Sequence, residues 1–320
     1  MPDFETRAEP HRRELLVHCY RMLGSMPEAE DAVQETFLRA WKAWDRYDER
    51  TASVRTWLYK IATNTCLTLL EGRSRRPLPA GLGAPGDDPR APLVPAFDVP
   101  WLQPFPDARL GDPAGNDPAG AVVRRGTLRL ALVAALQLLP ARQRAVLVLR
   151  DVLDFSADET ARLLDTSPAA VNSALQRARA GLSAAGPVAE EMAEPADGVR
   201  RTVDRYVEAF EAADVDRLIE LLSADVVLEM PPVPLWFRGA ADYGRFMARV
   251  YDLRGRVWRM APVGANTQPA MAAYCADEEG VLRLHTLQVF TVRGGRIAHT
   301  YVFQHPEVFA AFDLPPVLAG

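Results

Sequence analysis

The side chains best suited to acid–base chemistry lie in the last third of the chain, and the candidates are Asp225, Glu229, His285, His299 and Tyr301. A carboxylate beside a histidine inside an apolar enclosure can move protons. Each candidate also has a structural alternative. Asp225 can cap a turn, Glu229 alternates to the solvent side of its strand, and the histidines can be hydrogen-bonded core residues. We therefore predict no catalytic residues, no metal and no cofactor, and favour a protein-contacting role over small-molecule binding.

The elements that hold these residues follow from the periodicity of residues 199–312, which predicts helices first and strands after them. An amphipathic helical pair is expected over 199–223 and a further helix near 241–251. The result is an α+β cone with an antiparallel meander. The strands are expected at 225–230, 270–275, 282–292 and 296–303, with a hairpin turn at 293–295.

A pocket is possible inside this cone, although its apolar residues suit a core equally well. On the strand 282–292, alternation predicts His285 and Gln288 on opposite faces. The pocket candidates are Met230, Trp236, Phe237, His285, Gln288, His299 and Tyr301.

Residues 140–182 are expected to form an apolar helix followed by two short helices joined by a turn. Ser156 and Glu159 make a capping box for the first short helix, and Ser167 with Pro168 begins the second. One side of the last helix is apolar at helical spacing, and the other is polar with arginine near its C-terminal end. This composition suits the recognition helix of a helix-turn-helix, and a hairpin that packs on protein is the alternative. The DNA-contact candidates are Ser167, Ala169, Asn172, Ser173, Gln176, Arg177 and Arg179.

Residues 11–76 are also predicted to be helical, and two of their segments have unusual compositions. In DAVQETFLRAW (31–41), an exposed leucine among acidic and amide groups indicates either a protein-docking face or a solvated surface. In RTWLYKIATN (55–64) and the basic run after it, aromatic and basic residues suit single-stranded DNA, although Trp57 is better explained as core. The candidates are Asp31, Gln34, Glu35, Leu38 and Trp41 in the first segment, and Arg55, Trp57, Tyr59, Lys60, Asn64, Arg73, Arg75 and Arg76 in the second and its basic run.

Composition limits the remaining functions. The 320 residues have a net charge of −5, so contact with DNA must be local rather than a general basic coat. Residues 121–185, with nine basic and five acidic side chains, are the most basic part. We see no signal sequence and no membrane-length apolar stretch. The three cysteines are widely spaced, which suits a reducing compartment, so we predict a cytoplasmic protein with no membrane partner.

Proline and glycine mark the boundaries between these parts. Eleven prolines and six glycines in residues 77–120 exclude a helix there, and Trp101, Leu102 and Phe105 are expected to anchor this stretch. The predicted organisation is a helical domain at 11–76, a Pro/Gly-rich linker at 77–126, a helix-turn-helix domain at 127–185 and the α+β domain at 199–312.

Together the motifs resemble a bacterial sigma-70 factor of the extracytoplasmic-function (ECF) group. Residues 31–41 are similar to sigma region 2.2, residues 55–64 to regions 2.3 and 2.4, and residues 139–182 to region 4. Residues 199–312 resemble the SnoaL-like polyketide-cyclase fold that a subset of such factors carries at the C-terminus.

The resemblance implies a transcription factor whose partners are core RNA polymerase (the β′ clamp helices and the β subunit) and promoter DNA. It implies that residues 31–44 dock on polymerase, that residues 55–76 recognise and open the −10 element, and that the helix 168–180 reads the −35 element. RNA synthesis then belongs to the polymerase, and the chain is not an enzyme. The C-terminal domain is expected to modulate activity, with a small-molecule ligand as a further possibility.

Two alternatives remain. One is a cyclase- or isomerase-like enzyme fused to a DNA-tethering module, and the other is a ligand-sensing regulator that binds DNA directly. Neither needs a polymerase-docking face, so residues 31–44 distinguish them from a sigma factor.

Overall fold

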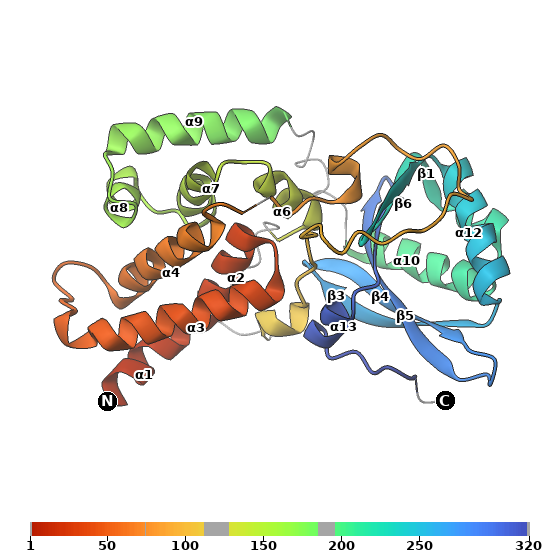
Figure 1. Ribbon diagram of the computed structural model, residues 1–320, viewed down its shortest axis with the longest axis horizontal. Coiled ribbons are helices and arrows are strands. Elements are labelled where there is room, and N and C mark those ends of the chain that lie inside the picture. Colours follow the sequence, from red (N-terminus) through yellow and green to blue (C-terminus); the bar gives the residue numbers. More distant parts are fainter. Residues whose placement is uncertain (1, 74, 112–127, 185–195, 319–320) are drawn as a thin grey trace. The chain divides into compact units, whose positions relative to one another are not determined.

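The computed structural model describes residues 2–73, 75–111, 128–184 and 196–318. Among these, residues 2–76 and 109–184 form one compact unit, and residues 77–108 and 196–318 form a second (Figure 1). No helix in the described ranges is long and apolar enough to cross a membrane. All three cysteines are free.

The first unit is helical, and its N-terminal part is built from α1 (Pro2–Ala8), α2 (Arg12–Leu23), α3 (Met26–Ala43) and α4 (Val54–Leu70). Helix α2 ends at Gly24, whose φ of 70° is the left-handed conformation that glycine adopts without strain. The Ser53 hydroxyl accepts a hydrogen bond from the Thr56 amide and so caps α4. These local signals place α3 and α4 where the sequence predicts helices.

The remainder of the first unit contains α6 (Leu130–Gln137), α7 (Ala141–Leu147), a π-helical turn (Val148–Val152), α8 (Ala157–Leu163) and α9 (Pro168–Ala184). The predicted capping box of Ser156 and Glu159 is present at α8. These helices pack on the N-terminal ones through a buried arginine: Arg144 donates to the Gln137 side chain at 2.7 Å and to the Met22 carbonyl.

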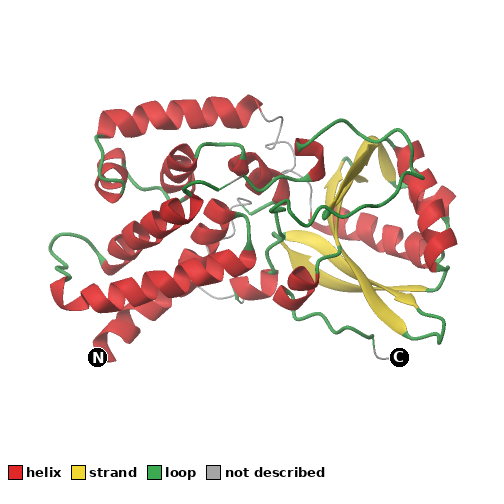
Figure 2. Ribbon diagram, in the orientation of Figure 1, coloured by secondary structure: helices red, strands yellow, loops and turns green. Residues whose placement is uncertain are grey.

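Within the described residues, the second unit contains a six-stranded sheet and four α-helices (Figure 2). Its helices are α10 (Ala196–Glu211), α11 (Val215–Glu220), α12 (Ala240–Arg254) and α13 (Pro306–Ala311). The strands are β1 (Leu222–Met230), β2 (Val233–Arg238), β3 (Trp258–Ala265), β4 (Gln268–Ala276), β5 (Leu282–Arg293) and β6 (Arg296–Phe303).

The strand order is β2-β1-β6-β5-β4-β3, and β1 pairs with β6 in parallel while the other neighbours are antiparallel. The sheet is therefore mixed, which corrects the expectation of a purely antiparallel meander. Strands β2 and β3 are absent from the sequence prediction. Both contain a proline, Pro234 and Pro262, and both lie at the edges of the sheet, where a missing backbone donor is tolerated.

A β-bulge changes the alternation on β5. Ala273 pairs with Thr286 but Tyr274 pairs with Leu284, so His285 is an extra residue on this strand. The simple period of two predicts opposite faces for His285 and Gln288. The bulge instead turns both toward the same cavity.

Residues 77–108, which we call the strap, belong to the second unit although they precede it by about 90 residues in the sequence. They run along the outside of the sheet and contain no α-helix or strand. The Gly86 amide donates to the Trp236 carbonyl at 2.7 Å, and the Ala96 amide donates to the Pro232 carbonyl at 2.9 Å. The predicted anchors are buried (Trp101, Leu102 and Phe105). Residues 112–126 of the predicted linker lie outside the described residues.

Candidate protein and nucleic-acid interfaces and a ligand cavity

Helix α3 presents large apolar side chains to the surface. Leu38 is 44% exposed and Trp41 is 52% exposed, while Asp31 and Gln34 are also exposed and Glu35 is half-buried. Phe37, on the inner side, packs against the Phe4 ring. An exposed leucine and tryptophan beside acidic and amide groups form a surface that can bind another protein.

The predicted −10 residues of α4 are largely engaged within the protein. Tyr59 is fully buried and its hydroxyl donates to the buried Glu14 carboxylate at 3.1 Å, so it is a core residue and not the DNA contact that the sequence predicts. Arg55 donates to both Glu14 oxygens, at 2.9 and 3.2 Å. Burial alone would raise the pKa of Glu14, but His11 and Arg55 outweigh it and hold that pKa below its ordinary value. Trp57 is half-buried beside the stacked rings of Trp44 and Tyr47.

Lys60 connects α4 to the helix-turn-helix. Its ammonium group donates to the Asp165 carboxylate at 2.8 Å and to the Arg162 carbonyl at 3.3 Å. Earlier on α4, the Arg55 guanidinium lies over the ring of Phe155, two residues before the start of α8. The predicted −10 surface is therefore partly covered by the part of the chain predicted to read the −35 element.

The basic run after α4 is held at the start of α3. Arg73 and Arg76 both contact one Glu28 oxygen, at 2.8 and 2.6 Å. Arg75 is exposed and Asn64 is half-buried. Two of the three predicted arginines are thus positioned by one carboxylate.

Helix α9 has the opposite character, because the polar residues predicted on it are at the surface. Ser167 caps the helix through the Ala170 amide at 3.2 Å. Arg177 donates to the neighbouring Ser173 hydroxyl, at 2.6 Å, whereas Arg179 makes a two-bond ion pair with Asp151 at 2.7 and 2.9 Å. The exposed residues are Ser167, Ala169, Asn172, Ser173, Gln176, Arg177 and Arg179.

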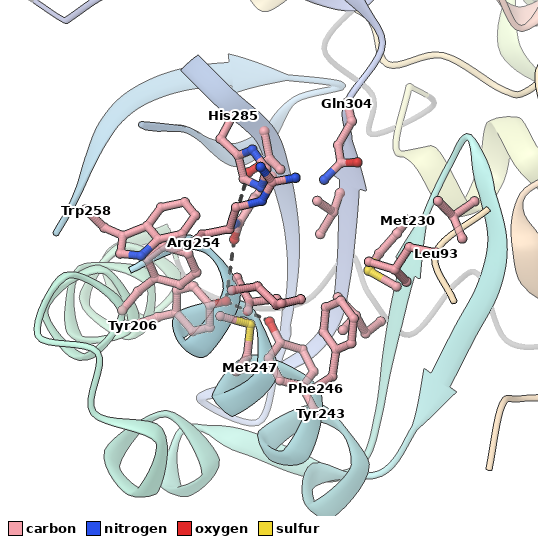
Figure 3. Close-up of a pocket in the computed structure, with 18 of the residues that line it drawn as sticks. Leu93, Tyr206, Met230, Tyr243, Phe246, Met247, Arg254, Trp258, His285 and Gln304 are labelled. Carbon is pink, nitrogen blue, oxygen red and sulfur yellow. Dashed lines mark hydrogen bonds between the residues drawn. The ribbon is translucent and has the colours of Figure 1, made fainter. Parts of the chain in front are cut away.

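The second unit holds a cavity of about 260 Å³ between α10, α12 and the sheet (Figure 3). At its inner end the Tyr206 and Tyr243 hydroxyls lie 2.7 Å apart, and Tyr243 donates to Thr300 at 3.2 Å. Arg254, His285 and Gln304 lie at the other end, where Arg254 and Gln304 are exposed. Burial and the nearby Arg254 lower the pKa of His285 to about 4, so this imidazole is neutral at pH 7.

Three of the predicted pocket residues, Met230, His285 and Gln288, line this cavity. The other four do not. Phe237 is a core residue that packs on Phe246. Trp236, His299 and Tyr301 belong to the opposite face of the sheet together with Glu229. Strand β1 aligns Glu229 with Trp236 on β2 and with Tyr301 on β6, and His299 lies two residues before Tyr301, on the same side of its strand.

The first part of the strap, at Ala80 and Gly83, contacts this opposite face. Glu229 accepts hydrogen bonds from the Ala80 amide at 2.7 Å and from His299 at 2.8 Å, and Trp236 donates to the Gly83 carbonyl at 3.0 Å. Glu229 is 2% exposed, which corrects its expected solvent position. Sequence reasoning could not find this arrangement, because the segment that covers Glu229 lies about 150 residues earlier.

Sequence reasoning also missed several residues of the cavity. Tyr206, Tyr243 and Arg254 line the cavity but are not among the predicted pocket residues. Leu93 and Pro95 come from the strap.

Three family models match separate segments of the chain. Residues 8–76 match Sigma-70 region 2, residues 129–182 match Sigma-70 region 4, and residues 203–300 match the SnoaL-like domain. The mixed sheet with its covering helices is the α+β part that the last match describes.

Two curated relatives span nearly the whole chain. The ECF RNA polymerase sigma factor SigG of Mycobacterium tuberculosis is 46% identical over 321 residues, covering 99% of this chain and 85% of the relative. SigJ of the same organism is 28% identical over 323 residues, covering 96% and 93%. The crystal structure of M. tuberculosis SigJ shares the fold, with a TM-score of 0.65 at 23% identity over 95% of this chain and 97% of that one. With two sigma regions and a full-length relative of this identity, the chain belongs to the ECF RNA polymerase sigma factors and carries a SnoaL-like domain at its C-terminus.

Proposed function

We propose that separate surfaces of the first unit bind core polymerase and the two promoter elements, and that the second unit controls these surfaces through the strap. In this proposal α3 docks on the β′ clamp helices of core RNA polymerase, with further contacts to the β subunit. Helix α4 and the arginines after it contact the −10 element, and α9 reads the −35 element. The exposed Leu38 and Trp41 support the first role, and the exposed polar face of α9 supports the last.

The observation that carries the control proposal is the position of the strap. It follows directly on Arg76, where the −10 part ends, and leads toward the −35 part, yet it is bound to the second unit by backbone and side-chain hydrogen bonds. Docking on the sheet restricts how far the strap can extend between the two DNA-binding parts. We infer that binding of both promoter elements within polymerase releases the strap from the sheet.

Contacts inside the first unit support a closed resting form. Lys60 is paired with Asp165, and Tyr59 packs edge-on against Phe155 at 5.4 Å. In this form α4 cannot offer Lys60 to DNA. Release of the strap and separation of α4 from α8 would open both surfaces.

Removal of the second unit tests this control. A chain that ends at residue 198 loses the sheet on which the strap docks, so run-off transcription with purified core polymerase should rise at least several-fold over that of the full chain. Core-binding affinity measured in the same preparation separates a change in docking from a change in promoter use. Equal or lower run-off product from the shortened, folded chain would contradict control by this unit.

We also propose that the cavity of the second unit binds a small molecule. Its volume of about 260 Å³ is larger than the ~150 Å³ of an engineered cavity that holds benzene. A catalytic alternative has less support, because the described residues that line the cavity include no carboxylate to work with His285.

A further inference from the structure

We infer that the cavity of the second unit selects a small amphipathic carboxylate, and that this ligand holds the strap on the sheet. The inference deepens the proposed control of transcription by naming the class of ligand and the element that responds to it. It is carried by the lining of the cavity, by the charge at its opening and by the origin of two lining residues in the strap.

The inner part of the cavity suits an apolar body. Its walls come from Phe210, Leu228, Phe246, Met247 and Trp258, all of which are buried. The polar groups at its base are already bonded to one another, since Tyr206, Tyr243 and Gln288 form a connected set. A ligand therefore gains most there from apolar contact. The volume corresponds to one or two rings or to a short alkyl chain.

The opening suits an anion. Arg254 is the one charged residue among the described lining residues, and no aspartate or glutamate opposes it. Gln304 and His285 line the same end of the cavity as Arg254, where an amide and an imidazole can also donate hydrogen bonds to a bound anion (Figure 3). A guanidinium binds a carboxylate with two parallel hydrogen bonds, and such charge-assisted bonds are stronger than neutral ones. A neutral or cationic head group would leave this arrangement without a partner.

The strap supplies part of the wall between two of its attachment points. Arg249 of α12 donates to the Pro89 and Ala91 carbonyls at 2.8 and 2.7 Å, and the Ala96 amide donates to Pro232 at 2.9 Å. Leu93 and Pro95 lie between these attachments and line the cavity. A ligand that contacts Leu93 and Arg254 together binds the protein more tightly when the strap is docked than when it is released. Its binding therefore shifts the equilibrium toward the docked strap.

Binding of matched probes to the full chain tests the inference without polymerase. We expect 2-naphthoate, measured by isothermal titration calorimetry, to bind about tenfold more tightly than the neutral 2-naphthylmethanol. This difference in affinity corresponds to the contribution of one charge-assisted hydrogen bond. Arg254→Gln should remove this preference. Arg245→Gln, an exposed arginine of the same helix that does not line the cavity, should keep it.

The strap is followed in the same samples by hydrogen exchange of the peptide 92–98. Addition of 2-naphthoate should slow its exchange, and Val250→Trp, which fills the cavity, should abolish that effect. If neither probe binds, or if the unaltered chain binds both equally well, the proposed carboxylate site is overturned. Binding with unchanged exchange of the strap peptide overturns the coupling. None of these binding and exchange measurements involves transcription, so their failure is distinguishable from a failure of the proposed control of transcription.

Discussion

Helices α4 and α9 are both predicted to contact promoter DNA, yet they hold their side chains in opposite ways. On α9 the polar residues face solvent, and Arg177 is bonded to its neighbour Ser173 on the same helix. On α4 Arg55, Tyr59 and Lys60 are engaged by partners elsewhere in the first unit. In the proposed function, one DNA-contact surface is therefore exposed and the other is partly covered, so we expect an active form to expose α4.

The largest expected effect concerns the exposed helix. Arg177→Ala should relax the preference for the upstream promoter box, because a lost bidentate base contact costs about 1–3 kcal/mol of discrimination. A promoter library transcribed by the holoenzyme measures this preference. The matched control is Arg179→Ala on the same helix, whose guanidinium is held by Asp151 and which should change the preference less. A stronger relaxation with Arg179→Ala would reverse the assignment of the two arginines.

A smaller effect is expected at the covered helix. Asp165→Asn removes the charge that holds Lys60 but suits the left-handed conformation of this residue, whose φ is 48°. Exposed ion pairs contribute at most about 1 kcal/mol, so binding of a fluorescent single-stranded −10 oligonucleotide should rise by no more than about fivefold. Asp158→Asn makes the same charge change at an exposed position of α8 and should leave binding unaltered. Equal gains from the two variants would show a general charge effect and not the release of Lys60.

The features that could be predicted from the sequence are those that short-range patterns encode. The capping box at Ser156, the polar face of α9 and the strands β5 and β6 depend on residues within one turn or one strand. The two sigma motifs depend on contiguous segments, and their matches confirm them.

The features that escaped prediction depend on distant partners. Tyr59 is buried because Glu14, 45 residues earlier, accepts its hydroxyl. Glu229 is buried because the strap covers it. His285 faces the cavity because a bulge interrupts the period of two on β5. None of these causes is visible in the local sequence of the residue that it affects.

Reversible locking of the strap tests its proposed release most directly. Pro106 of the strap and Ala265 of β3 face each other in an antiparallel bridge, where paired Cα atoms are about 4.5–5.5 Å apart and suit a disulfide. We would introduce Pro106→Cys and Ala265→Cys together, in a Cys275→Ala background, with Pro106→Cys alone as the control. The account predicts that oxidation lowers run-off transcription of the double variant at least several-fold, that reduction restores it, and that the single variant responds to neither. Equal transcription by the oxidised and reduced double variant, with the disulfide verified by mass spectrometry, would contradict the requirement that the strap leave the sheet.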